Sequence, residues 1–183
     1  DVSLAELGGP DTHAEHAGTV HVLATDEPDA FAATRALVGL LAAAGETISG
    51  VVDRPLLRAG ERRDVVRALV DAGTWVDLQA GWVTALVTGL GRLGGRTVGV
   101  LANDPGHTSG WLDADATDKA AGFVGLCERF AIPLVVLADV PGILPGLAQE
   151  RAGALRRGAA LFRTLIGASV PRVTVVTGRA YGG

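Results

Sequence analysis

Two glycine- and proline-rich segments in the last third of the sequence carry the residue types best suited to chemistry. One contains Pro141, Gly142, Pro145 and Gly146, and the other is formed by residues 178–183. Proline stiffens a loop, whereas glycine lets backbone N–H groups approach a ligand closely. A stiff loop with accessible N–H groups suits an oxyanion hole, in which backbone donors stabilise developing negative charge. The competing interpretation is that both segments only make turns at strand ends.

Asp139 directly precedes the first of these segments. An acid in this position could act as a general acid or base, or it could accept amide hydrogen bonds that hold the following loop in shape. No second titratable group accompanies it in the sequence to complete an acid–base pair. The sequence therefore favours the loop-holding role.

Other familiar patterns fail on context. The run from Gly89 to Gly94 matches the dinucleotide fingerprint G-x-G-x-x-G, but it lies within an expected strand and turn, and a strand follows it where a helix is required. The loop with Asp113, Asp115 and Asp118 resembles a calcium-binding EF-hand, but it lacks the glycine and the glutamate that such a loop requires at fixed positions. We interpret these glycines as structural and these acids as helix-capping residues.

Cysteine and histidine give no catalytic or metal-binding pattern. Cys127 falls on the apolar face of an expected helix, where a small buried hydrophobe is the usual role. The four histidines show no zinc-type spacing supported by cysteine or acidic partners, so no metal is expected. These histidines are His13, His16, His21 and His107.

Two expected strands position the glycine-rich segments. Residues 134–138 are continuously apolar and residues 173–177 nearly so, which predicts strands covered on both faces. A helix over about residues 152–168 separates them, so the strands should be parallel. Both glycine-rich segments then lie at the carboxyl edge of the sheet, where open α/β sheets bind ligands.

The earlier part of the sequence predicts further elements of an α/β fold. Gly94-Gly95 divides two β-compatible runs, which indicates a hairpin, and Asp115 is the expected N-cap of the helix that follows. In order, we expect irregular chain over 1–27, a helix over about 28–43, a linker over 45–60, a helix over 64–72, strands over 75–78, 84–92 and 97–102, and a helix from 115 to about 130.

Composition excludes several classes of protein. The chain has 183 residues, of which 48% are hydrophobic and 20% charged, as expected for a globular protein and not for a disordered one. A net charge of −4 argues against a nucleic-acid partner. One cysteine and no apolar membrane-length segment predict a cytoplasmic protein without stable membrane association. The absence of methionine predicts that the chain is a fragment.

Many short motifs, in order and at matching spacing, resemble the carboxyltransferase β subunits of biotin-dependent acyl-CoA carboxylases of the propionyl-CoA and acetyl-CoA type. The resemblance is strong over residues 62–183 and looser before them. The motifs lie at residues 93–103, 112–113, 118–121, 132–133, 139–142, 144–146, 149–150, 156–159, 170–171 and 179–183.

The resemblance implies an α/β fold of the crotonase/ClpP-like ββα spiral type, present here incompletely. It assigns residues 1–45 to the tail of an N-terminal carboxyltransferase half, residues 46–61 to a linker, and residues 62–183 to the opening part of the C-terminal half. The active site of such subunits forms between halves of different subunits. The resemblance therefore implies a homo-oligomer, a hexamer in this family, and an isolated chain that is inactive.

The resemblance also implies a reaction. Such subunits move a carboxyl group from carboxybiotin, on a separate carrier domain, to the α-carbon of a short acyl-CoA, while biotin N1 takes the α-proton. Backbone amide pairs hold the enolate and the biotin ureido oxygen. Carried onto this chain, the catalytic donors are Gly182 and Gly183, and the biotin- or substrate-binding residues are Pro141, Gly142, Pro145, Gly146 and Tyr181. A biotin carboxylase and a biotin carboxyl carrier are the implied partners.

Some positions depart from the family pattern, namely Asp104, Gly106, His107, Trp111 and Gly178. Trp111 and His107 lie in a loop that could line the entrance for biotin, so acyl selectivity could differ from that of better-known members. Two alternatives remain open at this point: a biotin-dependent acyl-CoA decarboxylase subunit, and a non-catalytic assembly partner of a carboxylase.

Overall fold

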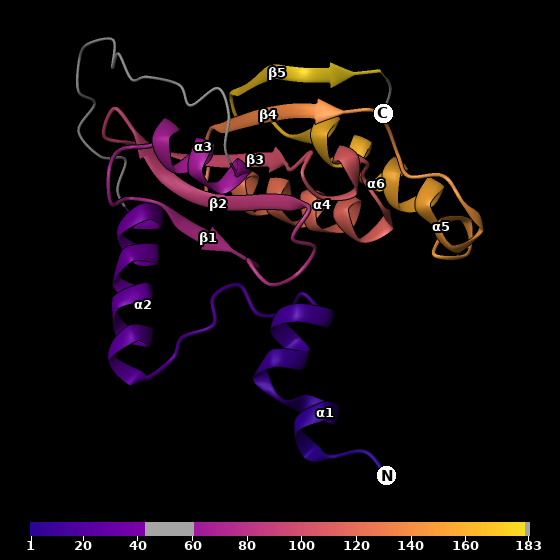
Figure 1. The fold of residues 1–183 in the computed structure, drawn as a ribbon. Coiled ribbons are helices and arrows are strands. Elements are labelled where there is room, and N and C mark those ends of the chain that lie inside the picture. The colour runs from indigo at the N-terminus through magenta and orange to yellow at the C-terminus, as the bar shows by residue number, and fades with distance from the viewer. Residues whose placement is uncertain (43–60, 182–183) are drawn as a thin grey trace.

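The computed structural model describes residues 1–42 and 61–181. A five-stranded mixed sheet forms the centre of the molecule, with helices packed on both of its faces (Figure 1). The elements are, in order, α1 (Leu4–Gly8), η1 (Thr12–His16), α2 (Glu27–Ala42), α3 (Arg62–Leu69), β1 (Val76–Leu78), β2 (Leu86–Leu93), β3 (Arg96–Asn103), η2 (Thr108–Gly110), α4 (Ala114–Arg129), β4 (Leu134–Val140), α5 (Leu147–Arg151), α6 (Ala154–Gly167) and β5 (Arg172–Ala180).

The strand order in the sheet follows the chain order, β1-β2-β3-β4-β5. Strands β1, β2 and β3 pair antiparallel, and β2 turns into β3 through Gly94 and Gly95, both with positive φ. Two residues with positive φ are what a tight hairpin turn requires, so the expected hairpin is confirmed. Strands β3, β4 and β5 pair parallel, which confirms the expected parallel pair at the end of the chain.

Alternating residues of the strands feed two separate cores. Leu86, Leu90 and Leu101 pack on the face that carries α4 and α6, together with Phe123 and Leu161 of those helices. Their strand neighbours Val87, Val98, Val100 and Leu137 pack on the opposite face against Val66 and Val70, which belong to α3 and its end. Successive side chains of a strand point to opposite faces of the sheet. A strand covered on both faces therefore has apolar residues at nearly every position of its sequence.

Strand β5 departs from the expectation of a buried strand. It is an edge strand, and Val173, Val175 and Val176 are 61%, 44% and 55% exposed. An apolar run predicts a strand but does not reveal whether another strand or helix covers it. The prediction of the element was correct, and the prediction of its burial was wrong.

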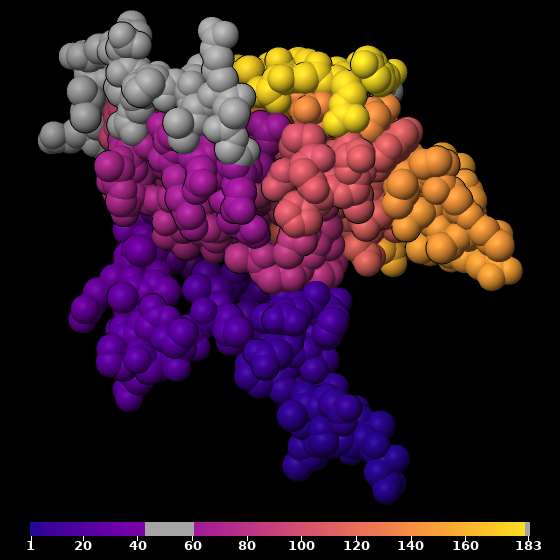
Figure 2. Space-filling model, viewed as in Figure 1, coloured from indigo at the N-terminus to yellow at the C-terminus, as the bar shows by residue number. Residues whose placement is uncertain are grey.

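The N-terminal segment is more ordered than expected. Ser3 and Glu6 form a reciprocal capping box that begins α1, and η1 follows as one turn of π-helix. These turns project away from the sheet as a separate lobe (Figure 2). Helix α2 is tied to the sheet through Leu40, which is buried and whose carbonyl accepts a hydrogen bond from Thr97.

The N-cap of α4 is Asp113 and not Asp115 as expected. Its side chain accepts a hydrogen bond of 2.7 Å from the N–H of Ala116, whereas Asp115 lies in the first turn and pairs with Arg157. Both acids are suitable by residue type, and only the backbone path decides between them. The expected linker over residues 45–60 lies outside the described residues.

Candidate functional site

The loops that follow β4 and β5 lie next to each other at one edge of the sheet. Val140 is the register partner of Ala180, and the N–H of Tyr181 points to the carbonyl of Val140 at 3.4 Å. The segment beginning at Pro141 and the segment ending in Tyr181 therefore start side by side, as the parallel pairing predicted. Tyr181 is 79% exposed at this edge. Gly182 and Gly183, the expected catalytic donors, lie outside the described residues.

The proline–glycine loop after β4 is fixed at its middle. Leu112 donates its N–H to the carbonyl of Gly142 and accepts from the N–H of Leu144, at 3.1 and 2.8 Å. Ile143, between them, pairs with Leu112 as an isolated parallel bridge, and its end packs against Gly158 of α6. Gly142 is buried within this arrangement, with φ 152°. The loop is held by the chain on both sides and is not a simple turn.

The structure separates the expected loop residues into two groups. Pro141 and Gly142 lie directly after β4, close to where Tyr181 follows β5. Pro145 and Gly146 are exposed beyond the Ile143 bridge, where Gly146 is the N-cap of α5. The first group shares the strand ends, and the second group leads away from them.

A bulge in β5 brings Asp139 and Arg179 together. Between the pairs Ala138–Val176 and Val140–Ala180, β5 contains two more residues than β4. The carboxylate of Asp139 fills the bulge and accepts hydrogen bonds from the backbone N–H and the Nε of Arg179, both at 2.8 Å. These two bonds, the backbone bond first, lower the pKa of Asp139 below its ordinary value. This geometry supports the loop-holding role of Asp139.

Gly178 is required by the same bulge. A Cβ at this position would lie 2.5 Å from the carboxyl carbon of Asp139 and 2.6 and 2.7 Å from its oxygens. Such contacts are shorter than real side chains adopt, so a larger residue would displace the carboxylate. The departure from the family pattern at residue 178 therefore has a local structural consequence.

Asn103 joins a third loop to this edge, a role that no local sequence pattern indicates. Its side-chain amide donates to the carbonyls of Asp139 and Gly110 at 2.6 and 3.3 Å, and its Oδ1 accepts from the N–H of Asp139 at 2.7 Å. The residue is 3% exposed. A buried amide with donors and acceptor all satisfied rigidly fixes the chain around it.

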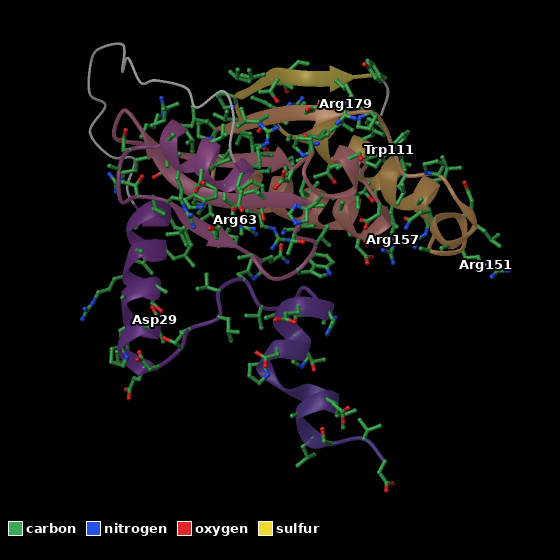
Figure 3. The ribbon with its side chains drawn as sticks, viewed as in Figure 1. Asp29, Arg63, Trp111, Arg151, Arg157 and Arg179 are labelled. Carbon is green, nitrogen blue, oxygen red and sulfur yellow. The ribbon has the colours of Figure 1, made fainter. Side chains whose placement is uncertain are left out.

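The loop between β3 and α4 passes close to the strand ends. Thr108, Ser109 and Gly110 form a left-handed turn with φ of 46°, 50° and 82°, and the Arg179 guanidinium donates to the carbonyl of Ser109 at 2.8 Å. Left-handed non-glycine residues store strain, which collects at functional sites. Arg179 and Trp111 are seen at the same end of the sheet (Figure 3). His107 is exposed and lies 3.3 Å from Asp104.

An apolar cavity of about 420 Å³ lies between the sheet and helices α4 and α6. Leu101, Val136 and Leu161 are among its apolar walls, and Asn103 is one of its few polar members. Val140 and Ala180 also border it. The cavity therefore extends to the strand ends, where Asn103 belongs both to its lining and to the network around Asp139.

Cys127 is a core residue, as its position on the helix predicted. Its side chain is fully buried, and burial raises the pKa of its thiol to about 12. Its sulfur lies where a side chain at Gly99 would have to fit. A thiol in this environment is not a nucleophile at neutral pH.

Over residues 1–42 and 61–181, no three side chains of His, Cys, Asp or Glu gather into a group that could hold a metal ion. The same part of the chain contains no helix with the length and apolarity to cross a membrane. At the strand ends, the charged groups Asp139 and Arg179 are committed to each other and to loop backbone. What the edge offers to a ligand is mainly backbone, with an exposed aromatic side chain beside it.

Comparisons with known proteins agree on one family. A carboxyl transferase domain matches residues 1–183. The chain is 48% identical, over its whole length, to the biotin-dependent acetyl-/propionyl-coenzyme A carboxylase beta6 subunit of Mycobacterium tuberculosis, of which it covers 41%. It is 38% identical to the methylmalonyl-CoA carboxyltransferase 12S subunit of Propionibacterium freudenreichii, of which it covers 38%. The chain thus spans about two fifths of these relatives.

Solved structures lead to the same family. A transcarboxylase 12S crystal structure, described as a hexamer assembly with methylmalonyl-coenzyme A bound, matches 96% of the chain with a TM-score of 0.85 and 38% identity, over 37% of its own length. A single-chain, multi-domain long-chain acyl-CoA carboxylase matches with a TM-score of 0.82 and 29% identity, over 18% of its length. These matches confirm the crotonase-like α/β fold. The chain belongs to the carboxyl transferase domain family.

Proposed function

We propose that the protein containing this chain is the carboxyltransferase component of a biotin-dependent acyl-CoA carboxylase. It transfers a carboxyl group from carboxybiotin to the α-carbon of a short acyl-CoA, propionyl-CoA or acetyl-CoA. Membership of the carboxyl transferase family and the names of the relatives support this proposal. The structural observation that carries it is the adjacency of the two backbone-rich loops after β4 and β5.

The chemistry of the reaction suits such an edge. Loss of the α-proton from a thioester places negative charge on the thioester oxygen. Preorganised N–H donors stabilise such charge, so no titratable side chain is required for this purpose. Losing one such donor costs about 3–4 kcal/mol of transition-state stabilisation. We assign to Gly182 and Gly183, which follow Tyr181 after β5 in the sequence, the donors that hold the biotin ureido oxygen, where negative charge collects as the carboxyl group leaves.

Asp139, Arg179 and Asn103 have a positioning role in this proposal. They hold one another and the backbone of three loops, so neither charged group is available to move the substrate proton. Their contribution is to fix where the chain leaves β5 relative to the loop after β4. Fixed placement matters because small displacements of catalytic groups cost large factors in rate.

Binding of biotin or the substrate is assigned to Pro141, Gly142, Pro145, Gly146 and Tyr181. Of these, Pro141, Gly142 and Tyr181 lie at the strand ends, and Pro145 and Gly146 lie beyond the Ile143 bridge. The ureido group is neutral, its oxygen accepts hydrogen bonds, and the ring has apolar faces. The partly buried Pro141 beside the exposed Tyr181 offers the matching combination of backbone and apolar surface. When bound, carboxybiotin supplies the carboxyl group, and this chain supplies only binding and orientation.

The proposal extends to assembly. We assign residues 1–45 to the tail of an N-terminal half, 46–61 to a linker and 62–183 to the opening part of a C-terminal half. A homo-oligomer, hexameric like the transcarboxylase 12S relative, and a biotin carboxylase with its carrier domain are the proposed partners. Exposed apolar residues on α6 fit such burial, because Leu155 and Ile166 are 81% and 83% exposed.

The reverse half-reaction tests the activity. The intact protein, incubated with methylmalonyl-CoA or malonyl-CoA and free biotin, should form propionyl-CoA or acetyl-CoA in a biotin-dependent manner, followed by chromatography. The 183-residue chain alone should not. Thioester consumption that does not depend on biotin, or a complete absence of transfer by the intact protein, would contradict the proposal. The comparisons favour this activity over a decarboxylase or a non-catalytic partner.

A further inference from the structure

Lys119 is the only lysine in a sequence that holds 16 lysine and arginine residues in total. It lies on α4, and only 1% of the residue is exposed. A long cationic side chain is almost never fully buried unless its charged end is satisfied by partners. The sequence therefore places its single side-chain ammonium group inside the protein, and all its other basic side chains except histidine are arginine.

The Nζ of Lys119 is surrounded by backbone carbonyls. It donates to Trp82, Leu86 and Gln79 at 2.6, 2.7 and 2.9 Å, and the carbonyl of Val83 lies at 3.3 Å. We call these four oxygens the carbonyl cage. Three of them belong to the segment that connects β1 to β2, and the fourth belongs to Leu86, the first residue of β2.

The segment is bent in an unusual way to form the cage. Gln79 and Val83 have φ of 54° and 47°. Residues other than glycine rarely adopt this left-handed backbone conformation. For a β-branched residue such as Val83 this conformation is a clear outlier. A central cation stabilises the converging carbonyls, because their oxygens repel one another unless a positive charge lies between them.

The same segment holds part of the N-terminal region. The backbone N–H of Gln79 donates to the carbonyl of His21 at 2.7 Å, and its side-chain amide donates to the carbonyl of Gly18. The ring of Trp82 packs against Gly18, where a Cβ would lie 2.3 Å from the ring. Gly18 itself has φ of 64°, so the fit depends on glycine.

We propose that the ammonium of Lys119 is a built-in monovalent cation that shapes the segment between β1 and β2 and, through it, the docking of residues 18–21. The cage is a cation site for a primary ammonium group, whether it is tethered to α4 or free. Lysine suits the cage because its charge is compact, whereas the planar guanidinium of arginine is larger. The proposal is independent of the carboxyl-transfer activity.

Electrostatics around the cage act in both directions. The pKa of Lys119 is lowered to about 7, first by burial and then by the charge of Arg63, while the charge of Asp77 opposes the change. The carbonyl oxygens also oppose it, because hydrogen bonds to the charged form favour that form. Asp77 is engaged by Arg63 at 3.5 Å, so the ammonium depends on the carbonyls for its partners.

A neighbouring cavity gives a free cation room to enter. It has a volume of about 480 Å³ and is lined by Lys119 together with Gln79 and Trp82 of the cage. His21 and Arg129 also border it. Shortening the lysine side chain would extend this cavity towards the cage.

Chemical rescue tests the proposal in the intact protein. Lys119→Ala should lower Tm by about 5–10 °C, as loss of a buried, fully bonded group does. Propylammonium at about a hundred times its dissociation constant should restore at least half of that loss, because a ligand that binds only the folded state stabilises it by mass action. Tetramethylammonium, which has no N–H donors, should not. Lys119→Met keeps the stem in place and should not be rescued.

Hydrogen exchange provides a second readout. In Lys119→Met, peptides covering residues 12–23 and 79–88 should exchange faster than in the wild type, while peptides covering β4 and β5 should not change. If Lys119→Ala is insoluble, its refolding yield should depend on propylammonium. A Lys119→Met protein with wild-type Tm and exchange would overturn the proposal. So would propylammonium that acts equally on wild type and Lys119→Ala, or a refolding yield indifferent to it.

Discussion

Asp139 accepts two hydrogen bonds of 2.8 Å from Arg179, one from its backbone N–H and one from its side chain. The contact spans adjacent strands at the point where β5 bulges. The same guanidinium reaches Ser109, and the backbone of Asp139 is bonded to Asn103. The pair therefore links three loops at one edge of the sheet, and its removal should affect the edge before it affects the core.

Replacing Asp139 with Asn should make the stability less dependent on pH in acid. The pKa of Asp139 is lowered in the folded protein from an ordinary value of 3.8, so the carboxylate stabilises the fold fully above that value. The contribution is lost as pH falls through the lower folded pKa. The difference in unfolding free energy between wild type and Asp139→Asn should be constant from neutral pH down to about pH 5 and shrink below about pH 4.

Urea unfolding at a series of pH values measures this difference. Arg179→Gln should reduce the pH dependence only in part, because it removes the side-chain bond, while the backbone N–H of residue 179, the first cause of the lowered pKa, still donates to Asp139. A difference that grows on acidification, or that does not change through pH 3, would mean that Asp139 does not form this contact in solution.

Gly178→Ala should destabilise the strand ends. Its methyl group would lie 2.5 Å from the carboxyl carbon of Asp139, and relieving the clash should cost about 1–3 kcal/mol of stability. Gly122→Ala is the matched control, because Gly122 lies exposed on α4 with nothing within 4 Å of an added Cβ. That variant should be neutral or more stable by up to about 1 kcal/mol, since alanine favours helix.

Thermal unfolding compares the two alanine variants directly. We expect Gly178→Ala, and not Gly122→Ala, to have a lower Tm than the wild type and a reduced rate of carboxyl transfer. Equal effects of the two substitutions would show that the bulge tolerates a side chain and that Asp139 is not confined by it.

Cys127 should be inert to alkylation in the folded protein. Its pKa of about 12 and its complete burial leave almost no accessible thiolate at neutral pH. Iodoacetamide should leave the peptide that contains Cys127 unmodified until the protein is unfolded in urea, as mass spectrometry can follow. Rapid modification of the native protein, with loss of activity, would instead place this thiol in the reaction.

The sequence predicted the sheet well because its signals are local. Gly94-Gly95 predicted the β2–β3 turn, and the apolar run at 134–138 predicted β4. The relation of the two glycine-rich loops followed from parallel pairing alone. The capping box formed by Ser3 and Glu6 was also readable in principle, and the expectation of irregular chain there was wrong because α1 is only five residues long.

The rest depends on contacts between distant residues. Asn103 meets Asp139 across 36 positions and Arg179 meets Ser109 across 70, so no local pattern marks them. Lys119 sits next to Asp118 in the chain and could be taken for another exposed charge, but its carbonyl partners lie more than 30 positions away. The exposure of β5 likewise depends on what packs beside it and not on its own residues.

A comparison of Gly183→Pro with Gly183→Ala in the intact protein tests whether the backbone N–H of Gly183 acts as a donor. Proline removes the backbone N–H that is proposed to act as donor, and alanine keeps it. With Tm close to wild type in both, Gly183→Pro should lower kcat for carboxyl transfer by about 10²–10³-fold, while Gly183→Ala should retain most of the activity. A folded Gly183→Pro protein with nearly wild-type kcat would contradict the proposal that this N–H stabilises the transition state.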